Sequence, residues 1–263
     1  MAITTLDGVI AGFQPPQSIV KSVSGTLVAG RPFTPLYTAG IPAAASVYAG
    51  GLNGVALTSL AGQIPFSGTN NYLGRFQGSV TQAGTLMLCD RLWHNSIVVT
   101  TTTAQAITTP AWPARDRTGT INGVDVYIGL EISGTVGTGT ATPSIVYTNS
   151  AGSGSKAGAM LVPYVASSLT GTFYPFTLQS GDVGVKSVES VTLGVSMTSG
   201  TAGLVAYRVL AQLEIPIGGM ATAIDALTGG MTKMYDNTVP FLIFIPSTTT
   251  TSNITAQMIC TQG

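Results

Sequence analysis

Charge is the property that this sequence lacks most. Aspartate, glutamate, lysine and arginine make up 8% of its 263 residues, against about 25% in ordinary soluble domains. The ten basic and ten acidic residues give a formal net charge of zero. Nothing therefore attracts the chain to nucleic acid or to an anionic membrane surface, and we expect neither as a partner. A net charge near zero promotes association, so we expect the chain to bind copies of itself.

Histidine and cysteine are also scarce, which limits metal binding. His94 is the single histidine, so a zinc site would need ligands from Cys89, Cys260 and scattered carboxylates. Two cysteines in a reducing compartment do not make a disulfide framework, and we predict that both are small buried apolar residues. The sequence predicts no metal site.

One short segment resembles a catalytic arrangement, because CDRLWH at 89–94 places a cysteine close to a histidine. A cysteine nucleophile with a histidine base needs the two side chains in contact. On a strand, however, Cys89 shares a face with Arg91 and Trp93, whereas His94 points to the other face. We therefore predict a buried cysteine, a tryptophan anchor and an ion pair from Asp90 to Arg91 or Arg117.

Other patterns of catalysis and cofactor binding are missing. Asp125 and Glu131 lie on one face of a predicted strand, but six residues separate them by about 20 Å, too far for a glycosidase pair. The glycine-rich strings VGTGTATP and SAGSGSKAG do not form a phosphate-binding loop, because Lys156 is not followed by serine or threonine. We predict no catalytic residue and no cofactor, and hence a protein that is not an enzyme.

Long apolar runs are absent as well. The mean hydropathy is +0.41, yet no window approaches the roughly 18 consecutive apolar residues of a membrane-spanning helix. The start MAITTLDGVIAGF lacks the basic region and apolar core of a secretory signal. We expect synthesis and assembly in a cytoplasm, without a membrane partner.

The strongest structural pattern is the alternation of β-strands. One apolar face runs through 124–132, where Asp125, Tyr127, Gly129 and Glu131 fall on a second face that we expect to be exposed. A similar alternation runs through 205–215, with Arg208, Gln212 and Glu214 on the polar face. Turn signals recur between such segments at the spacing of a β-sandwich. We predict an all-β protein, mainly an antiparallel β-sandwich or jelly-roll-like fold.

The remaining segments define the predicted domains. Residues 1–50 are rich in proline, glycine and alanine, and predict an extended arm that lies on its own subunit or on a neighbour. Residues 51–263 form the β-rich domain, which we expect to divide near residue 120 if it has two subdomains. Short helices are predicted within 53–62 and 220–230, both of which end in glycine.

Tyrosines in or near predicted loops suggest a second possibility, a face that binds sugars. They are equally compatible with polar filler on sheets and turns. The tyrosines are Tyr37, Tyr48, Tyr72, Tyr147 and Tyr235.

Several strings resemble one group of proteins. YTNSAG at 147–152 and SGDVGVKSVESVTL at 180–193 are similar to structural proteins of tailed bacteriophages. GTLVAGRPFTPLYTAG, AGQIPF and LCDRLWHNS share this similarity, which covers approximately residues 13–215. This chain has SGSK where the group usually has an AG-x-x-G-R pattern, and it keeps one cation there as Lys156.

The resemblance implies a virion component of the minor head or capsid decoration type, without catalytic residues. The partners would be copies of the same chain, which we expect to form a homotrimer, and the major capsid protein or other virion proteins. A tail-associated adhesin that binds a host glycan is the alternative, although the repeats usual in tail fibres are missing.

Overall fold

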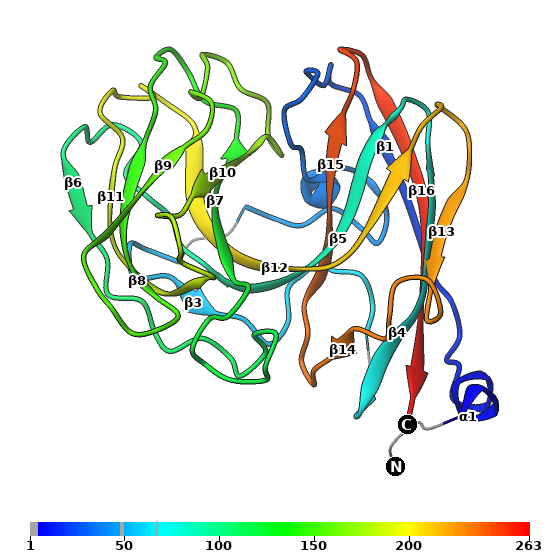
Figure 1. Ribbon diagram of the computed structural model, residues 1–263. Helices are drawn as coiled ribbons and strands as arrows, with labels where there is room; N and C mark the ends of the chain where they lie inside the picture. The colour runs from blue at the N-terminus through cyan, green and yellow to red at the C-terminus, as the bar shows by residue number, and fades with distance from the viewer. Residues whose placement is uncertain (1–4, 48–49, 67) are drawn as a thin grey trace. The chain divides into compact units, whose positions relative to one another are not determined.

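The computed structural model describes residues 5–47, 50–66 and 68–263. These residues form an almost entirely antiparallel β-protein, which confirms the predicted fold class (Figure 1). The chain divides into two compact units. Unit 1 comprises Met1–Ser46, Ser59–Asp90 and Val209–Gly263, and unit 2 comprises Val47–Thr58 and Arg91–Arg208. Most of the predicted arm belongs to unit 1, whereas residue 120 lies inside unit 2.

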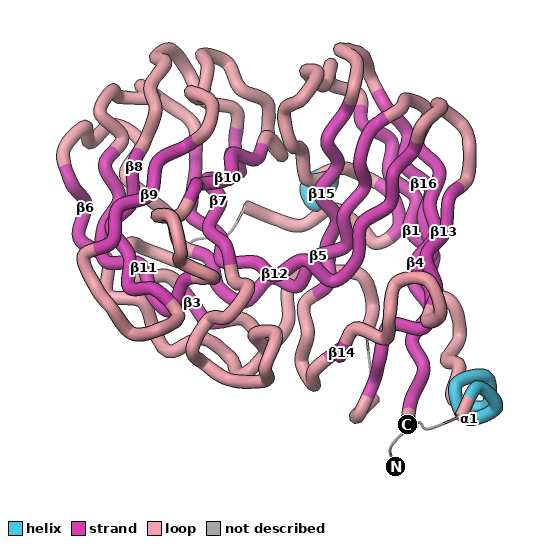
Figure 2. The backbone as a smooth tube through the Cα atoms, in the orientation of Figure 1, coloured by secondary structure: helices cyan, strands magenta, loops and turns pink. Residues whose placement is uncertain are grey.

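Unit 1 has two antiparallel layers (Figure 2). In one layer the strand order is β13-β4-β16-β1-β2, with β14 also paired to β4. The other layer contains β15, the first part of β5 and the last part of β12. Its elements are α1 (Leu6–Ala11), β1 (Gln17–Val23), the 3-10 helix η1 (Pro35–Tyr37), β2 (Gly40–Ile41), β4 (Asn71–Val80), β5 (Gly84–His94), β12 (Thr201–Ile215), β13 (Thr222–Asp225), β14 (Lys233–Met234), β15 (Pro240–Pro246) and β16 (Ser252–Gln262).

The two layers of unit 1 enclose one hydrophobic core, as expected of a sandwich. Phe76 of β4 and Met258 of β16 belong to it, together with Leu88 of β5 and Phe244 of β15. Gly78 lets the layers approach, because a Cβ there would lie 2.8 Å from a methyl carbon of Leu86. The alternation of inward apolar residues in these strands therefore produces a sandwich rather than a single sheet.

The N-terminal arm lies on its own subunit. Strand β1 pairs along its whole length with β16, and Lys21 ties the following segment down by donating to the carbonyls of Thr38 (2.9 Å) and Pro42 (2.6 Å). This part of the arm therefore packs on its own chain, which is one of the two surfaces that we expected. The arm's core residues are Ile19, Val23, Leu27 and Phe33.

Unit 2 is a curled sheet (Figure 2). Its strand order is β12-β7-β10-β9-β8-β11-β6, and β3 pairs with the last part of β5. The inner face of this sheet encloses a second core, to which most of its strands contribute. The remaining elements are β3 (Val55–Ala56), β6 (Ala104–Ala106), β7 (Tyr127–Gly134), β8 (Ser144–Asn149), β9 (Lys156–Met160), β10 (Phe173–Thr177) and β11 (Val185–Thr192).

Two segments predicted to be helical are not helices. Within 53–62 the chain forms turns and the short strand β3. Within 220–230 the strand β13 pairs with β4, and a turn follows. Isolated helices of this length are marginal, and pairing with the edge of β4 provides backbone hydrogen bonds that a lone helical turn cannot match. The α-helix that is present, α1, begins after Thr5, whose hydroxyl accepts a hydrogen bond from the Gly8 amide.

The predicted alternation at 124–132 is right on one face and only partly right on the other. Ile128, Leu130 and Ile132 are fully buried, as expected. Glu131 is also fully buried, because it pairs with an arginine inside unit 2. Gly129 is covered by the ring of Phe173, which a Cβ at that glycine would meet at 2.2 Å. The second face is therefore covered by protein at Gly129 and Glu131, whereas Tyr127 is 36% exposed, as expected.

Candidate functional site

The cysteines occupy buried positions, as predicted. Cys89 and Cys260 are free thiols, and Cys89 is fully buried. Burial raises the pKa of the Cys260 thiol to about 11, so this thiol stays protonated at neutral pH. A protonated, buried thiol is a poor nucleophile.

His94 is neutral under physiological conditions. Its side chain is buried at the end of β5, where burial and then the charge of Arg91 lower its pKa to about 3. A general base that works near neutral pH needs a pKa near the working pH. His94 therefore has the properties of a structural histidine.

The most buried charges form an ion pair in unit 2. The Nη1 and Nη2 atoms of Arg91 donate to the two carboxylate oxygens of Glu131 at 2.8 and 2.6 Å, and both side chains are fully buried. Arg117 pairs with Asp125 at 3.0 Å near the surface. We predicted Asp90 as the partner of Arg91 or Arg117, and the structure pairs Arg91 with Glu131 and Arg117 with Asp125. Oδ1 of Asp90 accepts a hydrogen bond from the Val239 amide at 2.9 Å.

A buried aspartate organises the loop that follows WPARDR. Asp116 accepts hydrogen bonds from the amides of Thr118, Thr120 and Val124 at 2.7–3.1 Å. Burial alone would raise its pKa, but the hydrogen bonds from Thr120, Thr118 and Val124 outweigh burial and lower the pKa. The DRTGT string is typical of such a side-chain-to-backbone loop, which makes Asp116 a structural residue.

The two strings with the strongest resemblance meet in one polar cluster in unit 2. The Tyr147 hydroxyl donates to Oδ2 of Asp182 (2.7 Å), and the Asn149 amide donates to Oδ1 (2.6 Å). The hydrogen bond from Tyr147 has the largest effect on the pKa of Asp182, followed by the bond from Asn149, and both lower it. Burial and then the bond to Asp182 raise the pKa of Tyr147 to about 12. The phenol therefore stays protonated and acts as a hydrogen-bond donor.

A second carboxylate extends this cluster along the same strands. Oε1 of Glu189 accepts from the Thr148 hydroxyl (2.7 Å) and from the Ser155 amide (3.1 Å). The loop between Asn149 and Lys156 is thus held against β11. These hydrogen bonds join β8 and the following loop to the carboxylates of Asp182 and Glu189, so we interpret the cluster as a support for the loop.

The tyrosines do not form one exposed face. Tyr147 is fully buried, and the ring of Tyr72 faces the ammonium group of Lys233 at 4.4 Å. Tyr37 and Tyr235 are half-buried. Tyr48 lies outside the residues that the structure describes.

The structure places much of the scarce charge inside the protein. Seven of the 20 charged side chains are buried, which leaves 13 for the surface. The side chains that are exposed consist largely of neutral polar and apolar groups. The buried charged residues are Lys21, Asp90, Arg91, Arg115, Asp116, Glu131 and Arg208.

The outward face of the larger layer in unit 1 shows this lack of charge most clearly. Neighbouring strands align Gln77 with Gln257, which are hydrogen bonded at 2.9 Å, and Ser22 with Asn253 at 2.8 Å. Among ten outward side chains in the middle of the three central strands, Arg75 alone is charged. They are Ser18, Val20 and Ser22 on β1, Asn253, Thr255, Gln257 and Ile259 on β16, and Arg75, Gln77 and Ser79 on β4.

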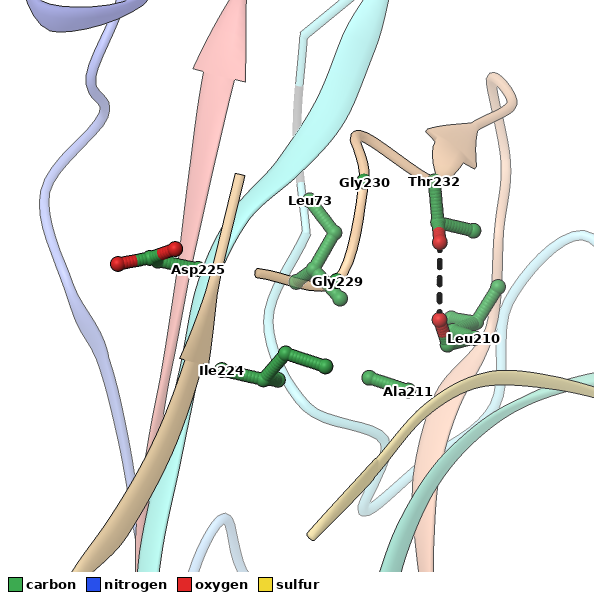
Figure 3. Close-up of a pocket in the computed structure, with 8 residues that line it drawn as sticks. All are labelled: Leu73, Leu210, Ala211, Ile224, Asp225, Gly229, Gly230 and Thr232. Carbon is green, nitrogen blue, oxygen red and sulfur yellow. Dashed lines mark hydrogen bonds between the residues drawn. The ribbon is translucent and has the colours of Figure 1, made fainter. Parts of the chain in front are cut away.

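An apolar pocket opens at the β13 edge of unit 1 (Figure 3). It is a small pocket that is partly open to solvent. Figure 3 shows Leu73, Leu210 and Ile224 around this space, whereas the carboxylate of Asp225 points away. Ala211, Gly229, Gly230 and Thr232 complete the lining, and the Thr232 hydroxyl donates to the Leu210 carbonyl at 3.0 Å.

The described residues contain no group of three or more histidine, cysteine, aspartate or glutamate side chains placed to hold a metal ion. Among the same residues, no helix has both the length and the apolar character needed to cross a membrane.

Comparison with known proteins shows no family. No protein-family model matches the chain, and no curated protein matches it. Similar solved structures include the T=1 particles derived from infectious bursal virus, with 8% identity, coverage of 95% of this chain and 79% of that chain, and a TM-score of 0.16. The VP2 subviral particle of infectious bursal disease virus has 7% identity, coverage of 96% and 82%, and a TM-score of 0.15. TM-scores this low do not indicate a shared fold.

Proposed function

We propose that this chain is a non-enzymatic structural protein of a bacteriophage virion, of the capsid decoration or minor head type. It acts by associating with copies of itself, as a homotrimer, and by binding the capsid. The resemblance of its strings to tailed-phage structural proteins suggests the class, and the placement of charge supports it.

The observation that carries the proposal is the neutral outer surface. An exposed, neutral sheet face such as that of unit 1 has little electrostatic repulsion to overcome when identical copies approach. Seven of the 20 charged side chains are buried, as the Arg91–Glu131 pair illustrates, which lowers the number of charges at the surface. Contacts through such a surface are individually weak, and symmetric copies on a symmetric lattice add them together.

A tail-associated adhesin is the second candidate. It would bind a host glycan through exposed tyrosine, threonine and serine side chains. The Thr- and Ser-rich loop at 247–251 is exposed and could supply hydroxyl groups. The tyrosine part of this hypothesis is weakened by the burial of Tyr147.

Gold labelling of intact particles tests the proposal. Antibodies against the purified chain are applied to virions of the phage that encodes it, and gold is located by electron microscopy. The same serum absorbed with the purified chain serves as the control. We expect specific label over the head. Label confined to the tail tip would favour the adhesin, and no specific label on intact or opened particles would overturn a virion role.

A further inference from the structure

The sequence contains two asparagine–glycine pairs, both of them in unit 2. They are Asn53–Gly54 and Asn122–Gly123. An asparagine before glycine is prone to spontaneous deamidation, because glycine has no Cβ to hinder attack of its nitrogen on the neighbouring side chain. Both asparagines are exposed, so access of water does not distinguish them.

Packing requires glycine at position 123. Gly123 has a φ of +80°, and a Cβ there would clash with the carbonyl oxygen of Val185. A residue with a side chain would have both a strained backbone and this clash. The fold therefore keeps, directly after Asn122, the residue that leaves its side-chain amide most open to attack.

The side chain of Asn53 is held by its surroundings. Its Oδ1 atom accepts a hydrogen bond from the Thr108 amide at 2.9 Å, and its backbone carbonyl accepts one from Nε1 of Trp93 at 3.0 Å. A side chain bonded in this way is not free to turn its Cγ atom towards the Gly54 nitrogen.

The side chain of Asn122 is free to turn. Among the residues that the structure describes, none is hydrogen bonded to this side chain, while its backbone amide donates to the Thr120 hydroxyl at 3.2 Å. The loop around it is anchored by the Asp116 carboxylate, which accepts from the amides of Thr120 (2.7 Å) and Val124 (3.1 Å). Rotation about its Cα–Cβ bond can thus bring Cγ of Asn122 towards the attacking nitrogen.

We infer that Asn122 is a site of spontaneous deamidation in the folded protein, whereas Asn53 is protected. The backbone nitrogen of Gly123 attacks Cγ of Asn122 and forms a C–N bond. The Cγ–Nδ2 bond breaks, and its electrons leave with ammonia, which also carries away the proton of the Gly123 amide. Water then opens the five-membered imide at either of its carbonyls, which gives aspartate or isoaspartate at position 122. No oxidant or reductant takes part.

The modification changes both the charge and the loop. It replaces a neutral amide with a carboxylate, so the formal net charge falls by one unit from zero. Isoaspartate also lengthens the main chain between Thr120 and Val124, which are both bonded to Asp116. This inference goes beyond the proposed function and does not depend on it.

Incubation of the purified full-length chain in mildly alkaline buffer tests the inference. Samples are digested with pepsin at acidic pH, where the reaction is slow, and fragmentation in a mass spectrometer locates each modified asparagine. We expect Asn122 to be converted roughly 3- to 10-fold faster than Asn53, the factor for one hydrogen bond that must break first. Asn122→Gln should remove the modification at this position, because the longer side chain closes the ring far more slowly.

The same chain unfolded in guanidinium chloride provides the control for local sequence. The two pairs have similar neighbours, LNGV at 52–55 and INGV at 121–124, so we expect similar rates when both are unfolded. A folded chain in which Asn53 reacts as fast as Asn122, or faster, would overturn the inference. So would a folded chain that leaves Asn122 intact for as long as the unfolded chain takes to react.

A variant that frees Asn53 tests the physical cause. Thr108→Pro removes the amide hydrogen that is donated to Asn53, and should raise the rate at Asn53 towards that at Asn122 without changing the latter. Circular dichroism checks that this variant is folded. An unchanged rate at Asn53 in the folded variant would show that its hydrogen bond is not the protection. The comparison of folded and unfolded wild-type chains does not need this variant.

Discussion

At the scale of single residues, the buried Arg91–Glu131 pair shows how this chain uses its few charges. Both side chains are fully buried, and both carboxylate oxygens accept hydrogen bonds. Taking two charges out of water is costly, and their mutual attraction repays this cost only when the geometry is good. The pair therefore matters most when one partner is lost.

Removal of one partner should destabilise the protein strongly. We expect Glu131→Gln to lower the free energy of unfolding by roughly 3–5 kcal/mol, because it leaves the Arg91 charge buried without its counter-ion. The double substitution Arg91→Met with Glu131→Leu should recover most of this loss. Urea denaturation followed by circular dichroism measures both.

The surface pair provides the control. Arg117→Ala breaks the exposed contact to Asp125, and should cost less than about 1 kcal/mol. Equal losses from Glu131→Gln and Arg117→Ala would contradict the assignment of a buried pair.

His94 should make the stability depend on pH. Its folded pKa of about 3 is lower than the ordinary value of 6.5, so below pH 6.5 the unfolded chain binds a proton that the folded chain does not. Stability from this residue is thus complete above pH 6.5 and falls as the pH decreases toward about 3, by at most about 1.4 kcal/mol per pH unit. Urea midpoints between about pH 5 and 7 avoid most carboxylate titration. His94→Gln should flatten the slope, and an unchanged slope in that variant would show that another group is responsible.

At the scale of elements, β1 turns a proline- and glycine-rich arm into part of a core. Ile19 is 1% exposed in the core of unit 1, whereas the next residue, Val20, is 44% exposed on the outer face. Ile19→Ala should therefore cost about 2–5 kcal/mol of unfolding free energy. Val20→Ala on the same strand should change it by no more than about 0.5 kcal/mol. Equal losses of unfolding free energy at the two positions would mean that β1 does not pair with β16 in this register.

The elements also show what the sequence could predict. Strict alternation at 205–215 predicted a strand, and β12 (Thr201–Ile215) contains it, because period-two patterns are local information. The strand β13 was missed, since its pairing with Gly78 and Phe76 of β4 depends on residues about 150 positions away. Glu131 was expected to be exposed because its partner Arg91 lies 40 positions away in the sequence.

The polar cluster was also not predicted, because it depends on contacts between residues far apart in the sequence. Tyr147 and Asp182 are 35 residues apart, and their hydrogen bond exists because β8 and β11 pair. Tyr147 lies in YTNSAG and Asp182 lies in SGDVGVKSVESVTL, but neither string by itself indicates the contact. The hydrogen bond between a protonated phenol and an ionised carboxylate could be recognised only from the positions of the two side chains in the structure.

At the scale of the whole molecule, two factors lower the number of charges at the surface. The sequence has few charged residues, and folding buries seven of them. Neutral side chains such as Gln77 and Gln257 satisfy each other across the unit 1 face. Solubility and assembly then depend on neutral polar and apolar contacts more than on long-range fields.

Self-association of the purified chain should consequently vary little with salt. One exposed ion pair between copies is worth up to about 1 kcal/mol, which corresponds to about a fivefold change in affinity. Sedimentation equilibrium at about 0.05 M and 0.5 M sodium chloride brackets the range in which surface charges become screened. We expect the concentration for half-assembly to rise by no more than about fivefold, and ammonium sulfate to lower it, because excluded salts strengthen apolar burial. A rise of a hundredfold with sodium chloride would mean that charged groups hold the copies together, which so neutral a surface does not provide.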